Sequence, residues 1–453
     1  MAETSYNNNN NNNNGSPISN LAQDHLLTVL LCLPIDSVLS FAMTCKRFRS
    51  LASSDTLWES ICRRDWGPKS VEAFKSSSNQ YRMLPWMRLY KQLCQLESVF
   101  CQKLSDPDGG LLLPNPRASH SLNFVSDCLV LFGGGCEGGR HLDDTWVAYI
   151  GNDFRRMQTW HKVSSGIPGG RFGHTCIVID DYVVLFGGIN DSGNRHNDTW
   201  VGQVAACHEN LGVTLSWRLL DVGSIAPPPR GAHAACCIGN RRMVIHGGMG
   251  LHGVRLGDTW VLELCENFRF GSWHEVVSHH PSPPARSGHS LTYIGGNRSV
   301  LFGGRGLGYE VLSDVWFLDV SSSCLKWVQV LYDLQNLPEG VTLPRVGHSA
   351  TLILGGRLLI YGGEDTYRHR KEDFWVLDTN ALQSTRLLRN IWKRLKAEGY
   401  KPKCRSFHRA CADYSGRYLH IFGGMVDGLV QPAEPSGLRF DGELLLVDLM
   451  PWL

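Results

Sequence analysis

Residues 171–188 read RFGHTCIVIDDYVVLFGG, which is an Arg-x-x-His pair followed by two apolar segments, the second ending in Gly-Gly. The same order recurs six times along the chain. The first glycine follows the His by 13 to 15 residues, and neighbouring first glycines are 54 to 61 residues apart. Recurrence at this period indicates one structural unit repeated six times. The paired positions are His120 with Gly133, His174 with Gly187, His233 with Gly247, His289 with Gly303, His348 with Gly362, and His408 with Gly423.

The rest of each repeat adds two more strand-like segments. After Gly-Gly, a polar loop leads to Asp-x-Trp in five repeats, and a lone Trp then opens a fourth segment. Four short strands bounded by Gly, Pro, Asn and Asp make one blade of a β-propeller. The sequence therefore predicts a mainly β fold of six blades, with repeats that start near residues 117, 171, 230, 286, 345 and 405. The lone tryptophans are Trp160, Trp217, Trp273, Trp327 and Trp392.

These repeated residues resemble the kelch motif from Arg117 to the C-terminus. The resemblance implies a six-bladed kelch propeller. We expect its glycines to allow close backbone approach near the axis. We expect its tryptophans to fill the space between blades. His246 stands where the other repeats have Phe or Tyr directly before Gly-Gly. A packing role is favoured for it.

The sixth repeat departs from the pattern. Asp441 is followed by Glu443 and Leu444 where the other repeats place a Trp, and little chain follows for a fourth strand. The segment Val99 to Leu104 lies at the equivalent distance before Arg117. We expect this segment to complete the last blade and remove an exposed sheet edge. The predicted propeller thus covers residues 99–453.

The first hundred residues differ in composition. Residues 1–17 include eight consecutive Asn and predict a solvated, disordered tail. No signal core or membrane-spanning run is found, so we expect a soluble protein of the cytoplasm, the nucleus or both, with no membrane partner. The 44 basic and 42 acidic residues give a net charge of +2, which argues against nucleic acid as the main partner. The 15 Cys contain no Cys-x-x-Cys pair and predict buried thiols.

Residues 18–67 predict a small domain of three helices. Leucines at helical spacing indicate the first helix, Pro34 separates it from a second capped by Asp36, and Ser54 or Asp55 can cap a third. This order resembles the F-box. The resemblance is carried by Leu21, Asp24, Leu26, Leu27, Leu33-Pro34, Cys45-Lys46-Arg47-Phe48, Leu51 and Leu57-Trp58.

The F-box resemblance implies a Skp-type adaptor and, through it, a cullin as partners. Three short helices are marginal as an independent fold, and their leucines are too numerous to be covered internally. Ala22 stands where the family usually has Pro and is expected to affect only the loop before the first helix. Residues 68–98 read as a helical linker. The residues expected to bind the adaptor are Leu21, Leu26, Leu27, Leu33, Pro34 and Trp58.

Two kinds of catalytic kelch protein fit the residues poorly. Kelch-type copper radical oxidases use two His, two Tyr and a Tyr linked to Cys, whereas the His residues here recur once per repeat, as a structural residue does. Plant kelch proteins that steer glucosinolate breakdown use a Glu-x-x-x-Asp-x-x-x-His iron motif. Here Glu310 and Asp314 are followed by Leu318 at the His position, which leaves too few ligands. We expect no catalytic residue, metal site or cofactor.

Strand order predicts where a substrate would bind. In a four-stranded meander, the connection into the first strand and the connection out of the second lie at the same end of the blade. The arginines that start the repeats should ring this mouth, and a structural role is favoured for them, bonded to carbonyls or to an Asp of a neighbouring blade. The arginines of the loops after Gly-Gly vary in position, so we expect them to bind an acidic or phosphorylated segment. They are Arg140, Arg195, Arg255, Arg305, Arg368, Arg370 and Arg439.

The two modules together resemble plant F-box/kelch-repeat proteins. The resemblance implies the substrate-receptor subunit of an SCF-type (Skp adaptor, cullin, F-box) E3 ubiquitin ligase, whose propeller binds the target protein. The chain shows no RING zinc pattern, so it is expected to transfer no ubiquitin itself. The alternative is a non-ligase kelch scaffold or a ligand-binding propeller. Retention of the adaptor by residues 1–98 would separate these hypotheses.

Overall fold

The computed structural model describes residues 17–77, 84–104, 112–150, 159–207, 212–239, 241–277, 281–320, 325–332, 343–379, 391–426 and 439–450. Residues 1–16, nearly all of the predicted tail, lie outside the described residues. The chain divides into a small helical unit, Met1–Asp65 with Met83–Cys94, and a larger unit, Trp66–Arg82 with Gln95–Leu453. No helix in the described part of the chain has the length and apolar character needed to span a membrane.

The helical unit contains one more helix than the sequence predicts. The sequence predicted no helix between the second and the third, where α3 (Lys46–Ala52) begins after Cys45. The Cys45 backbone is extended (φ −154°), and its sulfur accepts a hydrogen bond from the Phe48 amide. Leu26, Phe48 and Leu51 form the core between these helices. The elements are η1 (Pro17–Asn20), α1 (Gln23–Cys32), α2 (Ile35–Ala42), α3 (Lys46–Ala52), α4 (Asp55–Trp66) and α6 (Trp86–Cys94).

The expected linker belongs partly to each unit. Its Ser-rich start is helical, because α5 spans Pro68–Ser77 and buries Val71 and Phe74. Helix α6 packs in the helical unit, where the Trp86 amide donates to Asp55 at 2.6 Å and the Tyr90 hydroxyl donates to Asp65 at 2.8 Å. The linker therefore contributes to the folding of both units.

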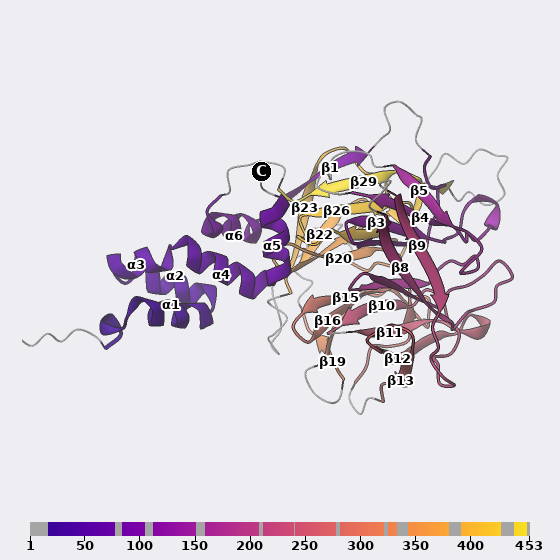
Figure 1. Cartoon of the computed structure of the whole chain (residues 1–453), viewed down its shortest axis with the longest axis horizontal. Coiled ribbons are helices and arrows are strands. Elements are labelled where there is room, and N and C mark those ends of the chain that lie inside the picture. Colours follow the sequence, from indigo (N-terminus) through magenta and orange to yellow (C-terminus); the bar gives the residue numbers. More distant parts are fainter. Residues whose placement is uncertain are drawn as a thin grey trace, which may run out of the picture. The chain divides into compact units, whose positions relative to one another are not determined.

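The larger unit is a propeller of four-stranded antiparallel sheets; in Figure 1 the strands β10 to β13 of one sheet lie side by side in this order. Its blades have the strand order predicted from the repeats. The first three are β2 (Ser121–Val125), β3 (Cys128–Phe132), β4 (Thr145–Tyr149) and β5 (Trp160–Ser164); β6 (Thr175–Ile179), β7 (Tyr182–Phe186), β8 (Thr199–Cys207) and β9 (Gly212–Leu219); and β10 (Ala234–Ile238), β11 (Arg242–Met249), β12 (Arg255–Leu264) and β13 (Gly271–Glu275).

The fourth and fifth blades repeat this arrangement. Short extra strands pair near the start of some repeats, such as β14 (Arg286–Ser287) with β17 (Arg305–Gly306). The main strands are β15 (Ser290–Gly295), β16 (Arg298–Phe302), β18 (Val315–Asp319) and β19 (Lys326–Val330), then β20 (Ser349–Ile353), β21 (Arg357–Tyr361), β22 (Phe374–Leu377) and β23 (Trp392–Gly399).

The sixth blade is completed by the segment expected from the sequence. Strand β1 (Ser98–Leu104) pairs antiparallel with β29 (Leu444–Asp448), next to β26 (Tyr418–Phe422) and β25 (Arg409–Ala412). It also pairs in parallel with β23 of the fifth blade. This second pairing was not predicted, and it joins two blades into one continuous sheet. The minor strands of this blade are β24 (Arg405–Ser406), β27 (Met425–Val426) and β28 (Arg439–Phe440).

The core lies between blades, and the lone tryptophans fill it as expected. The Trp273 ring of the third blade lies 4.8 Å from Phe186 of the second. The Trp327 ring lies 5.2 Å from His246, which occupies the equivalent position in the third blade. His246 is fully buried, so its role in packing is the one the sequence favours.

A ring of backbone hydrogen bonds joins all six blades around the axis. In each repeat, the residue before the His donates its amide to the carbonyl of the equivalent residue one blade earlier, at 2.6 to 2.9 Å. These residues have left-handed backbone with φ between 54° and 68°, a conformation that favours glycine. They are Ser119, Gly173, Ala232, Gly288, Gly347 and Phe407.

Candidate functional site

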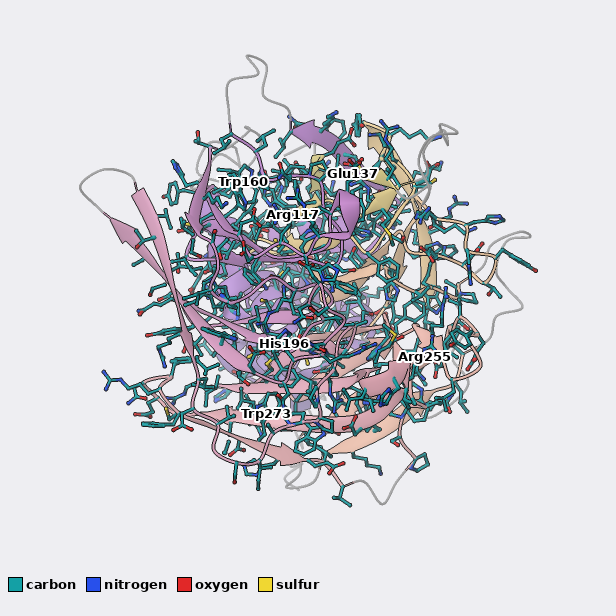
Figure 2. All side chains as sticks on the ribbon, turned by 90° about the vertical axis from the view of Figure 1, so that its right-hand side faces the viewer. Arg117, Glu137, Trp160, His196, Arg255 and Trp273 are labelled. Atoms are coloured by element: carbon teal, nitrogen blue, oxygen red, sulfur yellow. The ribbon has the colours of Figure 1, made fainter. Side chains whose placement is uncertain are left out.

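The arginines that start the repeats are buried and bound within their own blades; Arg117 is one of the residues labelled in Figure 2. Arg117 donates to both carboxylate oxygens of Asp144, at 2.6 and 3.1 Å, and to the Gly133 carbonyl at 3.0 Å. The Trp146 indole donates to the same carboxylate at 2.7 Å. Burial opposes ionisation, but the hydrogen bonds from Arg117 hold the pKa of Asp144 below its ordinary value.

The same Arg–Asp pair recurs in the next four repeats, at 2.6 to 2.8 Å. The expectation of an Asp from a neighbouring blade is therefore corrected, because each Asp comes from the blade of its own Arg. Asp314, the middle residue of the iron-like motif, is one of these partners. Around the mouth, all six repeat-starting arginines are at most 2% exposed and are structural.

The sixth blade lacks the Asp-x-Trp pair and uses Glu443 instead. Arg405 approaches Glu443 at 3.4 Å and Asp441 at 3.9 Å. Glu443 also pairs with Lys103 of β1 at 2.8 Å and with Lys403 at 3.0 Å. Burial alone would raise the pKa of Glu443, yet the hydrogen bonds from the two lysines lower it to about 2. This cluster fastens the closing strand to the sixth blade.

The loop arginines predicted to bind substrate fall into three groups. Arg305 and Arg370 both lie 3.7 Å from the buried carboxylate of Glu364, which already supplies each of them with a counter-ion. Arg255, labelled in Figure 2, stacks over the exposed ring of Tyr309 at 4.4 Å, and Arg195 donates to the Gly193 carbonyl. The exposed arginines are Arg140, Arg368 and Arg439.

An apolar pocket of about 320 Å³ lies at this mouth and was not predicted. None of the seven loop arginines is among its lining residues. Most of its apolar side chains directly follow a repeat-starting Arg or a Gly-Gly pair, and this position in the repeat is the signal that could have revealed it. The large apolar side chains are Phe172, Met249, Phe407, Met425 and Phe440.

The helical unit exposes a second apolar surface, which differs from the predicted one. Leu21 and Pro34 are exposed, and Leu33 and Leu27 are partly buried. Leu26 is 1% exposed and Trp58 is 3% exposed. Leu26 belongs to the core of the unit, and the Trp58 indole donates to the Ala52 carbonyl at 2.7 Å. These two residues stabilise the unit and are removed from the candidate surface.

Three further exposed apolar residues of this unit were missed. Val29 on α1 is 45% exposed, Leu39 on α2 is 41% exposed, and Met43 just after α2 is 80% exposed. Leu39 and Met43 are four residues apart and so lie on one side of the helix. We name the helical face by its residues Leu21, Val29, Leu33, Pro34, Leu39 and Met43.

Arg64 binds the C-terminal end of α1, next to Leu33 and Pro34 of the helical face. Its guanidinium donates to the carbonyls of Leu31 and Leu33 at 2.6 and 2.8 Å and pairs with Asp65 at 2.6 Å. The last carbonyls of a helix have no partner within the helix, so this contact satisfies them. Leu33 and Pro34 are thereby held in one conformation.

Comparisons with known proteins match both units. Residues 23–64 match the F-box-like family, and residues 98–304 and 207–340 match the KLHDC2/KLHL20/DRC7 Kelch-repeats domain. An F-box/kelch-repeat protein of Arabidopsis thaliana is 61% identical over 96% of this chain and 93% of its own length. The chain is an F-box/kelch-repeat protein. Neither matched family description names a catalytic activity.

More distant matches agree with this family. Adagio-like protein 3 of Oryza sativa subsp. japonica is 30% identical over 85% of this F-box/kelch-repeat chain, which covers 58% of that protein's length. The solved structure of YjhT has a TM-score of 0.51 at 15% identity and covers 74% of this chain and 96% of its own, which supports the propeller fold. In the described residues, no cluster of His, Cys, Asp or Glu could hold a metal ion.

Proposed function

We propose that this F-box/kelch-repeat protein is the non-catalytic substrate-receptor subunit of an SCF-type ubiquitin ligase, acting in the cytoplasm or nucleus. The observation that carries the proposal is the helical face. Large apolar side chains stay exposed on a small unit that matches the F-box-like family. An apolar surface of this kind favours a protein partner. A Skp-type adaptor fits it, and a cullin would join through the adaptor.

The propeller mouth would then bind the target protein. Its apolar pocket can take an apolar side chain, while Arg140, Arg368 and Arg439 remain exposed on loops after Gly-Gly. A target segment that combines an apolar residue with nearby acidic or phosphorylated residues fits this arrangement, because guanidinium groups pair bidentately with carboxylate and phosphate. The pocket is thus proposed as the main anchor, with the arginines around it.

Charge substitution on the helical face tests the adaptor interface. In the full chain, Leu39→Glu with Met43→Glu should reduce the amount of co-purified Skp-type adaptor at least tenfold, because both changes would bury a charge without a partner. Both side chains are exposed in the chain alone, so its melting temperature should stay within a few degrees.

Thr56→Glu is the matched control, since Thr56 is an exposed polar residue in the first turn of α4. This variant should retain the adaptor fully. Undiminished adaptor recovery with the double variant would refute the proposed interface.

A further inference from the structure

A ring of histidine–hydroxyl contacts joins the inner strands of neighbouring blades. His174 Nε2 lies 3.2 Å from the Ser121 hydroxyl of the preceding blade. His233 Nε2 meets the Thr175 hydroxyl at 2.7 Å in the same way. Two further pairs are His348 with Ser290 at 2.8 Å and His408 with Ser349 at 2.9 Å. The hydroxyl residue always directly follows the His of its own repeat.

The pattern fails at two of the six junctions. Ala234 offers no hydroxyl to His289, and Arg409 stands where a hydroxyl would meet His120. Both Nε2 atoms are buried without a hydrogen-bond partner. Alanine is a simple loss of the hydroxyl group. Arginine instead puts a large charged group at the channel, although a small hydroxyl is enough for the hydrogen bond to His Nε2 at the other junctions.

Arg409 has no counter-ion among the described residues. Its Nε donates to the His120 carbonyl at 2.8 Å, and no carboxylate of the described residues lies within ion-pair distance of it. This sets it apart from the repeat-starting arginines, each of which faces a carboxylate. A charged group that is partly buried without a partner is costly, so a bound anion would stabilise it.

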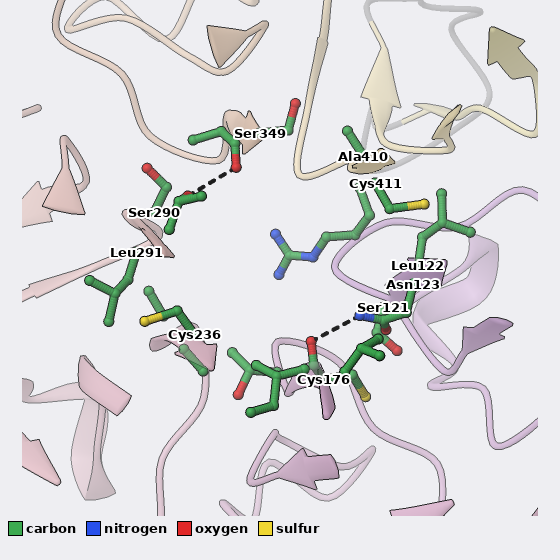
Figure 3. A pocket seen from close by; sticks show the side chains of 18 of the residues that line it. Ser121, Leu122, Asn123, Cys176, Cys236, Ser290, Leu291, Ser349, Ala410 and Cys411 are labelled. Carbon is green, nitrogen blue, oxygen red and sulfur yellow. Dashed lines mark hydrogen bonds between the residues drawn. The ribbon is translucent and has the colours of Figure 1, made fainter. Parts of the chain in front are cut away.

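The surrounding cavity suits an anion. Arg409 lines a channel cavity of about 390 Å³ between the inner strands, shown in Figure 3, and it also lines the mouth pocket. Among the residues that the structure describes, no Asp or Glu lines either space. Hydroxyl groups of several blades surround the channel cavity. They belong to Ser121, Thr175, Ser290, Thr292 and Ser349.

Phe407, two residues before Arg409, is a second exception in the same repeat. The equivalent residues of the other repeats are Ser, Gly or Ala, and Phe407 adopts φ 55°, which is unfavourable for a bulky side chain. A Cβ added at Gly347 would lie 2.9 Å from the Phe407 ring, so the neighbouring blade leaves room for this ring. The sixth repeat thus places an aromatic ring at the mouth pocket and a guanidinium that borders both this pocket and the channel cavity.

We propose that Arg409 anchors a small oxyanion, a carboxylate or a phosphate group, inside the propeller channel. The guanidinium fork would hold two oxygens of the ligand, and the Ser and Thr hydroxyls around the cavity would contact the others. This site is separate from the helical face, and its existence does not depend on the ligase function.

Calorimetric titration of the purified full chain at low ionic strength tests the site. Inorganic phosphate and citrate are the probes, and at least one should bind saturably at one equivalent per chain. Binding of phosphate alone assigns the site to phosphate groups, binding of citrate alone assigns it to carboxylates, and binding of both supports the general oxyanion site. Failure of both probes to bind at millimolar concentrations would overturn the proposal.

Substitutions then locate the binding. Arg409→Gln should weaken binding at least tenfold, because hydrogen bonds to charged groups are among the strongest in proteins. Arg409→Lys keeps the charge without the fork and should bind measurably but more weakly. The matched control is Arg269→Gln, which removes an exposed arginine elsewhere in the propeller and should leave binding unchanged. Equal binding by wild type and Arg409→Gln would also overturn the proposal.

Arg409→Ser separates a ligand role from a structural one. This change restores the hydroxyl found at four of the other five junctions and gives His120 Nε2 a partner. The variant should melt at or above the temperature of the wild type and should bind neither probe. A folded Arg409→Ser protein that still binds the anion would place the site elsewhere.

Discussion

Residues at equivalent positions of the repeats make the same contacts in this propeller. The Asp of Asp-x-Trp accepts hydrogen bonds from a buried Arg and from the Trp two residues later, which ties the start of the repeat to its third strand. Such a role could be predicted from regular recurrence, although the choice of blade could not. The partner depends on how the loop folds back, and residue spacing alone does not encode this. Arg409 and Phe407 were missed because no other repeat has Arg or Phe at the equivalent position.

Removal of one carboxylate should show how much an Arg–Asp pair contributes to the free energy of unfolding. Asp258→Asn would leave Arg230, which is fully buried, without a counter-ion. We expect the free energy of unfolding to fall by about 3 kcal/mol, as when one partner of a buried ion pair is removed. Urea unfolding of the full chain measures this. Glu275→Gln, an exposed charge loss in the same blade, is the control and should change stability by less than about 0.5 kcal/mol. Equal effects of the two changes would contradict the structural role.

At the level of elements, the closing strand β1 is the least regular part of the propeller. Its existence follows from the missing fourth strand of the last repeat, so the sequence was sufficient to place it. Its parallel pairing with β23 was not foreseen, because nothing in the repeat pattern describes a strand shared by two blades. The helical unit shows the opposite case. Its leucine spacing indicated helices, but the separate helix α3 after Cys45 depends on a local backbone turn that spacing does not reveal.

Loss of β1 should open the sheet edges of two blades. A chain that starts at Arg117 exposes the edges of β29 and β23, whereas one that starts at Gln95 keeps them paired. Exposed edges promote association. We expect the shorter chain to give lower soluble yield and aggregation in light scattering, with a lower melting temperature. Equal yield and melting temperature for both chains would show that β1 does not close the ring.

For the whole molecule, the buried histidines couple the fold to pH. Burial, reinforced by nearby arginines, lowers the pKa of the six repeat histidines, and that of His348 falls to about 3. These groups are neutral in the fold and take up protons in the unfolded chain below about pH 6.5. Their contribution to stability is therefore complete only about one pH unit or more above that value and is lost progressively as the pH falls through it.

Acid should therefore destabilise the propeller before most carboxylates titrate. Urea unfolding of the full chain at pH 7.5, 6.5 and 5.5 should show a free energy of unfolding that already falls between the first two and falls more steeply between the second and the third. His408→Gln removes one of the six groups and should make the decrease shallower. A free energy that rises between pH 6.5 and 5.5 would contradict neutral buried histidines.

Binding of the adaptor decides whether this chain acts as a ligase receptor, and a titration measures it. Purified full chain is titrated with a purified Skp-type adaptor, followed by size-exclusion chromatography with the cullin added. We predict a one-to-one complex with sub-micromolar affinity that carries the cullin into the same peak. Absence of binding at micromolar adaptor, by a chain whose propeller is folded, would exclude the receptor function.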